Sequence, residues 1–271
     1  MDTIQYKTKT FGLKQYISEI PGFINVLGVK VNMLNLNQAY DVIDAWIQRG
    51  KQNYVSVAAV STIMACHRSF AARKAVNSAG LVTPDGMPLV WLGQLLGCNV
   101  GRVYGPDLML LTCEKSIKKG YSHYFYGGKP GVPERLAARL KQRFPDLNVA
   151  GTYSPPFEKM TPKKDAAIVE KINRANPDIV WLGLSSPKQD FWMAEHLGKI
   201  KAPVMIGVGA AFDFHSGRVK QAPRWIQRSG LEWAFRLSQE PKRLWRRYLF
   251  DNPAFVVNVI LQLMQIKQFP V

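Results

Sequence analysis

The chain has 271 residues, of which 47% are hydrophobic and 20% are charged, a balance typical of globular proteins that bury a sizeable core. Its formal net charge of +17 predicts an anionic partner, such as nucleic acid, an acidic membrane surface or a phosphorylated substrate. No run of residues has the length and purity of a transmembrane helix, and the polar first 20 residues do not resemble a signal peptide. We therefore expect a cytoplasmic protein whose membrane contact, if it has one, is peripheral.

Apolar runs of strand length alternate with helical patterns along most of the chain. Two short runs about Gly28 predict a hairpin over residues 23–33, and a helix ending at Gly50 follows. Further strands are expected at residues 54–58, 81–82, 121–126, 147–153, 179–184 and 203–208. Further helices are expected from Ser61, as its cap, to Val76, from Pro106 onward, and over residues 87–96, 132–143 and 161–175. This alternation predicts an α/β fold with a Rossmann-like, mostly parallel sheet and helices on both faces.

The composition changes after Phe214. Between Arg218 and Arg247 basic residues outnumber acids and alternate with aromatic ones, and residues 254–269 are apolar apart from a narrow polar stripe. We therefore expect an N-terminal arm at 1–21, an α/β catalytic domain at 22–215 and a basic, largely helical appendage at 216–271. The appendage suits the surface of an anionic bilayer, while nucleic-acid binding and packing on a partner subunit are the alternatives.

Two charged side chains are candidates for chemistry at the edge of the sheet. Asp85 follows a strand on a turn made by Pro84 and Gly86, where its carboxylate can act as a general base on a sugar hydroxyl. The alternative is that Asp85 only caps the next helix. Arg102 can pair with a diphosphate through its planar guanidinium, or it is an ordinary surface arginine.

Two glycine-bearing loops also follow predicted strands. Gly127 with Gly128, and Gly207 with Gly209, offer backbone N–H groups to an anion, although neither loop is a full dinucleotide fingerprint and both fit plain tight turns. The pair Lys188 and Gln189 begins a helix after a strand. There the amide of Gln189 can bind a base edge or a sugar hydroxyl, or the pair is simply exposed.

The three cysteines and four histidines share no metal-ligand spacing, and no Asp-x-Asp element is present. We therefore expect chemistry without a metal or other cofactor, in which arginines and backbone groups stabilise a departing diphosphate. The cysteines are expected to be buried free thiols.

Short motifs lie in a consistent order between residues 22 and 247. They are TPDGMP at 83–88, Arg102 with GPDLM at 105–109, YGG at 126–128, Gly183 with PKQD at 187–190, GVGAAFD at 207–213, and LEW at 231–233 with Arg236 and EPKR at 240–243. In these motifs the chain resembles the WecG/TagA/CpsF family of bacterial glycosyltransferases. The resemblance implies a peripheral enzyme at the inner face of the cell membrane. It implies transfer of a sugar from a UDP-sugar to a polyprenyl-diphosphate-linked acceptor, with inversion and without a metal, in cell-surface polysaccharide synthesis.

The same resemblance implies roles for individual residues. Asp85 is the expected catalytic base, and Arg102 and Gln189 are the expected donor contacts. In the appendage, the residues expected to close the site and to contact diphosphate are Arg236, Arg243 and Arg246. Ser56 stands where many relatives have a Thr-x-Asn element, so it is the expected substitute on the donor side.

Other functions fit parts of the sequence. A non-catalytic nucleotide- or nucleic-acid-binding α/β protein is one alternative, and an epimerase or hydrolase of nucleotide sugars is another. We favour the transferase, with no nucleic-acid partner, and we expect that the chain can form a homo-oligomer.

Overall fold

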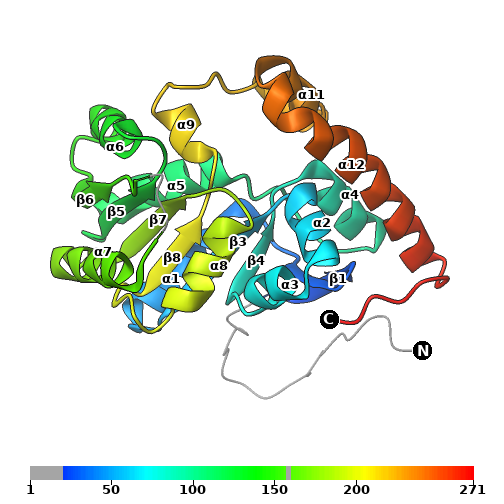
Figure 1. The fold of residues 1–271 in the computed structure, drawn as a ribbon, viewed down its shortest axis with the longest axis horizontal. Coiled ribbons are helices and arrows are strands. Elements are labelled where there is room, and N and C mark those ends of the chain that lie inside the picture. The colour runs from blue at the N-terminus through cyan, green and yellow to red at the C-terminus, as the bar shows by residue number, and fades with distance from the viewer. Residues whose placement is uncertain (1–20, 157–159) are drawn as a thin grey trace.

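The computed structural model describes residues 21–156 and 160–271, so the expected N-terminal arm lies, apart from Pro21, outside the described residues. A six-stranded sheet of order β4-β3-β8-β7-β5-β6 forms the centre of the molecule (Figure 1). All of its strand pairs are parallel, which confirms the predicted α/β class. The strands are β3 (Asn53–Ala58), β4 (Leu81–Pro84), β5 (Ser122–Gly127), β6 (Asn148–Tyr153), β7 (Ile179–Gly183) and β8 (Val204–Gly207).

Helices cover both faces of this sheet, as predicted. One layer consists of α1 (Leu36–Gln48), α5 (Gly105–Ile117), α6 (Val132–Arg143) and α9 (Ala211–His215), and the other includes α7 (Pro162–Ala175) and α8 (Lys188–His196). Along β7, Ile179 and Trp181 pack into the first layer, while Val180 and Leu182 pack into the second. A strand buried on both faces has no polar face, which explains why the sequence shows continuous apolar runs here.

Besides the two cores between the sheet and its helix layers, the molecule has a third cluster of buried side chains. It is formed by the antiparallel hairpin of β1 (Phe23–Val26) and β2 (Val29–Asn32), together with α2 (Val60–Arg68), α3 (Phe70–Asn77) and α4 (Met87–Leu95). The hairpin confirms the prediction, but the helix expected from Ser61 to Val76 is two helices. The N-cap is Ala59 rather than Ser61, and Ser69 interrupts the chain in an extended conformation because its side chain caps α3 by accepting from Ala72 N.

The three cysteines are free thiols. Cys66 and Cys113 are buried as expected, and Cys98 is only half-buried. Burial raises the pKa of the Cys66 thiol to about 12, so this side chain behaves as a small apolar group.

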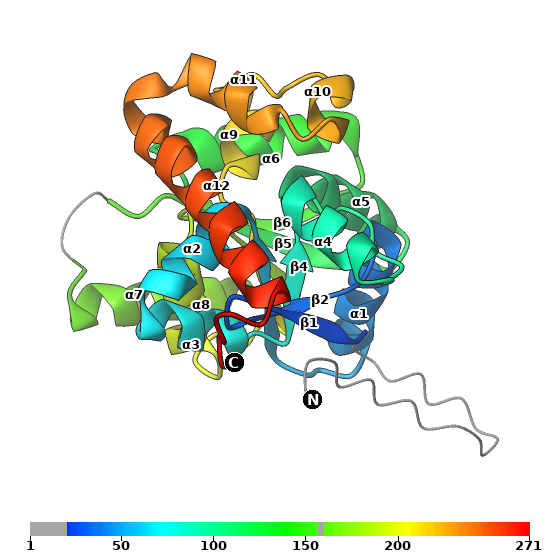
Figure 2. The same cartoon turned by 90° about the vertical axis from the view of Figure 1, so that its right-hand side faces the viewer.

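The appendage consists of α10 (Arg224–Arg228), α11 (Glu232–Gln239) and α12 (Pro241–Leu263). Figure 2 shows α12 running from α11 back to the β1–β2 hairpin. At that end, Gln262 accepts from Leu27 N at 3.0 Å and donates to Asn25 O at 2.9 Å. The expected boundary at residue 215 falls where α9 ends. Among the described residues, no helix has the length and apolar character that crossing a bilayer requires.

Candidate functional site

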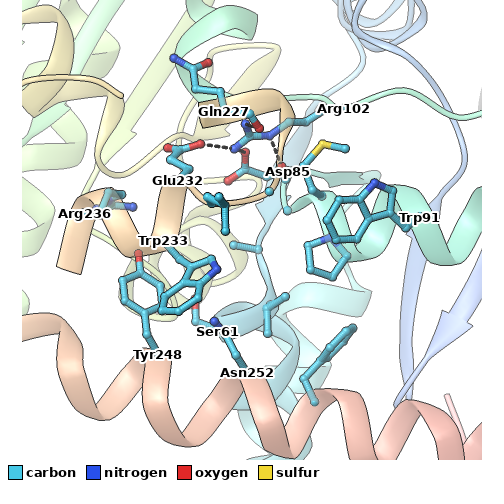
Figure 3. Close-up of a pocket in the computed structure, with 18 of the residues that line it drawn as sticks. Ser61, Asp85, Trp91, Arg102, Gln227, Glu232, Trp233, Arg236, Tyr248 and Asn252 are labelled. Atoms are coloured by element: carbon cyan, nitrogen blue, oxygen red, sulfur yellow. Dashed lines mark hydrogen bonds and ion pairs between the residues drawn. The ribbon is translucent and has the colours of Figure 1, made fainter. Parts of the chain in front are cut away.

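A cavity of about 380 Å³ lies between the carboxyl end of β4 and the appendage helices α11 and α12 (Figure 3). Its charged and hydroxyl-bearing lining includes Asp85, Arg102, Tyr104, Glu232, Arg236 and Arg247. Its apolar lining includes Met87, Trp91, Leu231, Trp233, Phe255 and Val256. The cavity therefore joins a charged region to an aromatic and aliphatic one, an arrangement suited to an amphiphilic ligand.

Asp85 directly follows β4, and its N–H donates to Ala58 O at 3.0 Å, which holds the turn against β3. The N-cap of α4 is Gly86 and no side chain caps that helix, so the alternative role of Asp85 as a helix cap is excluded. Burial raises the pKa of the Asp85 carboxyl to about 6, while the charges of Arg102, Arg236 and Arg247 act to lower it. At neutral pH the carboxylate is therefore ionised yet more basic than usual, as a general base must be.

Arg102 is held beside this carboxyl and is not an ordinary surface arginine. Its Nε donates to the main-chain oxygen of Asp85 at 2.5 Å, and its Nη2 lies 3.5 Å from Asp85 Oδ1. The guanidinium stacks 4.1 Å from the centre of the Tyr104 ring. Its shortest ion pair, at 2.7 Å, is with Glu232 of the appendage.

Of the appendage arginines named from the sequence, the structure brings only Arg236 to the cavity. Arg243 is exposed and pairs with Glu240 at 2.6 Å, and Arg246 is exposed over the ring of Trp245. Arg247 lines the cavity instead and donates to Ser61 Oγ of α2. Its Nε has no partner among the described residues, and burial lowers the pKa of its guanidinium.

Sequence reasoning missed Arg247, although a signal for it was present. Leu244, Asp251 and Phe255 are the buried residues of α12, and they recur at the spacing of one helical face. Arg247 comes three residues after Leu244 and four before Asp251, so it lies on that face. Arg243 and Arg246 lie about 40° and about 100° around the helix axis from Arg247, both on the side away from Leu244, Asp251 and Phe255.

A second group of the expected residues gathers at the carboxyl ends of β5, β7 and β8. At Gly127 φ is +120°, and a Cβ there would lie 2.8 Å from the carbonyl carbon of Gly183. At Gly207 a Cβ would lie 2.8 Å from Gln189 Nε2. Gln189 is buried, and its Oε1 is an acceptor with no partner in the described part of the chain. Lys188 is exposed, so the alternative interpretation, in which this pair is simply exposed, holds for Lys188 and not for the buried Gln189.

The contacts beneath these loops are structural. Ser56 is buried and donates to Asp190 Oδ1 at 2.6 Å, while Ser186 donates to the other oxygen at 2.6 Å. Two amides that were candidates for anion binding are already used, because Gly128 N donates to Gly183 O and Gly209 N to Leu182 O. The buried Asp190 thus fixes the start of α8, which carries Gln189.

The strand order relates the two groups. Asp85 follows β4, the glycines follow β5 and β8, and β3 lies between β4 and β8. Because neighbouring strands are about 4.8 Å apart, the ends of β4 and β8 are separated by about 10 Å. One extended ligand can therefore reach both groups along the carboxyl edge of the sheet.

Comparison with known proteins shows which family the chain resembles. The model of the glycosyl transferase WecG/TagA/CpsF family matches residues 24–268. An N-acetylglucosaminyldiphosphoundecaprenol N-acetyl-beta-D-mannosaminyltransferase of Bacillus spizizenii strain W23 is 33% identical over 186 residues, which is 68% of this chain and 70% of that protein. The protein of the same name from Bacillus subtilis strain 168 is 31% identical over 196 residues, or 72% of this chain and 73% of the relative.

Proposed function

Because the chain belongs to the glycosyl transferase WecG/TagA/CpsF family, we propose that this glycosyltransferase moves a sugar from a UDP-sugar to a polyprenyl-diphosphate-linked acceptor. The transfer inverts the anomeric carbon, needs no metal, and serves the synthesis of a cell-surface polysaccharide. The observation that carries the proposal is the Asp85 carboxyl in a cavity that combines three arginines with an apolar lining. A diphosphate joined to a prenyl chain needs both kinds of surface.

The chemistry is a direct displacement. Asp85 takes the proton from the acceptor hydroxyl, whose oxygen attacks the anomeric carbon as the bond from that carbon to the UDP oxygen breaks. Attack from the face opposite the leaving group inverts the configuration. Arg236 and Arg247, which line the cavity with Asp85, stabilise the phosphate charge of the substrates.

On the donor side, Gln189 and the glycine loops support a site for UDP. The unpartnered Gln189 Oε1 can accept from a base or ribose, and Gly207 leaves room for that side chain. From there the diphosphate extends toward Arg102 and brings the sugar to Asp85. The roles of Ser56 and of the loop amides in donor binding stay predictions, as do those of Arg243 and Arg246.

The outer face of α12 supports docking on the anionic inner face of the cell membrane. Val257, Ile260, Leu263 and Met264 are exposed there, whereas the polar Gln262 faces the β1–β2 hairpin. Lys242, Arg243 and Arg246 are exposed at the other end of the helix. Exposed apolar side chains beside exposed cations fit a bilayer with acidic headgroups, and this surface brings the cavity to a lipid-linked acceptor.

The test is UDP release from a panel of UDP-sugars, with and without a short-chain prenyl-diphosphate-linked sugar. UDP-N-acetylmannosamine with an N-acetylglucosamine-diphosphate-prenyl acceptor comes first in the panel, because the names of the two relatives give N-acetylmannosamine as the transferred sugar and N-acetylglucosaminyldiphosphoundecaprenol as the acceptor. We expect release that depends on the acceptor and that falls by about 100-fold or more in Asp85→Asn. Asp146→Asn makes the same change at an exposed position outside the cavity and should keep full turnover.

Two other outcomes would contradict the proposal. Release of UDP without an acceptor would indicate a nucleotide-sugar hydrolase. No release across the panel, together with salt-sensitive binding of oligonucleotides, would indicate a nucleic-acid-binding protein.

A further inference from the structure

Glu232 is the one carboxylate that the appendage places in the cavity, among the described residues that line it. Its Oε2 lies 2.7 Å from Arg102 Nη2, and its Oε1 accepts from the Tyr104 hydroxyl at 2.7 Å. Both oxygens are thus held, and the residue is buried. The acid arrives from residue 232, far along the chain from Arg102, and it does so at the first turn of α11.

Arg102 is shared unequally between two carboxylates. The nitrogen that lies 2.7 Å from Glu232 lies 3.5 Å from Asp85 Oδ1. An ion pair at 3.5 Å is at the limit of a hydrogen bond, whereas one at 2.7 Å is a strong, charge-assisted one. The short bond therefore belongs to Glu232, and the carboxylate that faces the substrate has only the long one.

We propose that Glu232 is a positioning residue for the transfer: it holds the Arg102 guanidinium away from the Asp85 carboxylate and so keeps that carboxylate a competent base. The proposal rests on the proposed function, because it assigns Asp85 the base of that reaction. An arginine bonded fully to Asp85 would stabilise its charged form and weaken its hold on a proton. A second acid that takes the arginine prevents this.

Several charges face Asp85. Arg102 faces it from the segment before α5, Arg236 from α11 and Arg247 from α12, and all three favour the ionised carboxylate. Glu232 is the negative charge that opposes them, and it acts together with burial. Loss of the Glu232 charge leaves three cations around Asp85, and it frees one of them to bond the carboxylate directly.

The test uses Glu232→Gln in the full chain, because glutamine keeps the shape of the side chain and removes its charge. Titration of the Asp85 carboxyl by ¹³C NMR on aspartate-labelled protein, assigned with Asp85→Asn, reports the base directly and needs no turnover. We expect the midpoint, near 6 in the wild type, to fall by about one pH unit. The acid limb of the kcat profile should move to lower pH by the same amount, and the plateau value of kcat should fall by about threefold as the base weakens.

Two variants serve as controls. Glu232→Asp keeps the charge and should keep the Asp85 midpoint close to that of the wild type. Glu240→Gln removes the same charge from the appendage at a position that pairs with the exposed Arg243 and should leave both readouts unchanged. A merely structural role for Glu232 would lower kcat at every pH without moving the midpoint.

An unmoved or raised midpoint in Glu232→Gln would overturn the proposal. A lower KM in Glu232→Gln, with the acid limb of kcat at the same pH as in the wild type, would also overturn it. In that case Glu232 would only occupy the place of a substrate phosphate on Arg102. Failure of the proposed function looks different, since the wild type itself would transfer no sugar to any acceptor.

Discussion

Arg68 at the end of α2 forms an ion pair with Asp251 of α12, with 2.6 Å between Nη1 and Oδ1. The two partners differ in exposure, because 56% of the Arg68 side chain is accessible but only 11% of the Asp251 side chain is. The pair joins the appendage to the helix whose Ser61 accepts from Arg247, so it helps to hold the cavity closed.

This asymmetry predicts unequal effects of removing either partner. Arg68→Ala leaves a largely buried carboxylate without its hydrogen-bonded partner, and the substitution should lower the free energy of unfolding by about 1–3 kcal/mol. Asp251→Asn leaves an exposed arginine that water can solvate, so this substitution should lower the free energy of unfolding by less than about 1 kcal/mol. Urea unfolding measures both values, and the rate of trypsin cleavage within 216–271 reports loosening of the appendage. Equal losses would contradict the burial argument.

The pKa of Asp85 predicts the acid limb of the reaction. Since the base must be ionised and its pKa is about 6, kcat should rise about tenfold per pH unit below 6 and level off above it. Steady-state kinetics between pH 4.5 and 8, at saturating substrates and fixed ionic strength, measure this profile. An acid limb near pH 4 would mean that Asp85 is not the titrating base.

The same carboxyl predicts a pH-dependent gain in stability for Asp85→Asn. The pKa of Asp85 is about 6 in the folded chain and 3.8 for a free aspartate side chain, so the folded state holds this proton more tightly. The stability that it contributes is complete below about pH 3.8 and is lost as the pH rises through 6. Between pH 4 and pH 7 the free energy of unfolding of Asp85→Asn should therefore rise relative to that of the wild type. The expected change is about 2 kcal/mol after allowance for the partial exposure of Asp85. Urea unfolding of both proteins across this range tests the sign, and a shift toward the wild type would contradict it.

Gly207→Ala should impair donor binding. The added Cβ meets Gln189 Nε2 and Met193 Cε at 2.8 Å each, and the amide is the more consequential of the two because its oxygen is the unpartnered acceptor. We expect KM for the UDP-sugar to rise by about tenfold, with a smaller change in kcat. Gly22→Ala is the control, because a Cβ there has no neighbour within 4 Å. An unchanged KM in a variant with a normal melting curve would place the donor elsewhere.

Charge on the outer face of α12 should release the protein from membranes. Val257 and Ile260 are 55% and 48% exposed, so Val257→Asp with Ile260→Asp should leave the fold intact while opposing insertion into an anionic bilayer. We expect at least a tenfold loss of binding to vesicles that contain phosphatidylglycerol, measured by flotation. Leu197→Asp, at an exposed leucine after α8, is the matched control. Full vesicle binding by the double variant would exclude this face.

The sequence was enough to predict the architecture and to single out Asp85 as the candidate base. The strands and helices follow from apolar runs and spacing that each segment carries within itself, and β7 reads as a strand because both of its faces are buried. Asp85 could be singled out because a carboxylate after a strand of a parallel sheet lies at the edge where ligands bind. The end of α2 and the start of α3 at Ser69 are also set locally, by the cap that Ser69 forms. The apolar pattern continues across Ser69, however, so the sequence predicted a single helix there.

Only the tertiary structure decided which appendage residues reach that base. Successive residues of a helix point about 100° apart, so the rotation of α12 determines whether Arg243, Arg246 or Arg247 enters the cavity. Packing of Leu244 and Phe255 and the bond of Arg247 to Ser61 set that rotation. Likewise, Glu232 and Arg102 are 130 residues apart, and their contact depends on how the appendage folds back over β4. The sequence by itself determined the sheet and its helices, because those follow from local periodicity, and it placed the candidate base at the edge of the sheet, because Asp85 directly follows a strand. The charges that surround the base depend on long-range packing, which no local pattern encodes.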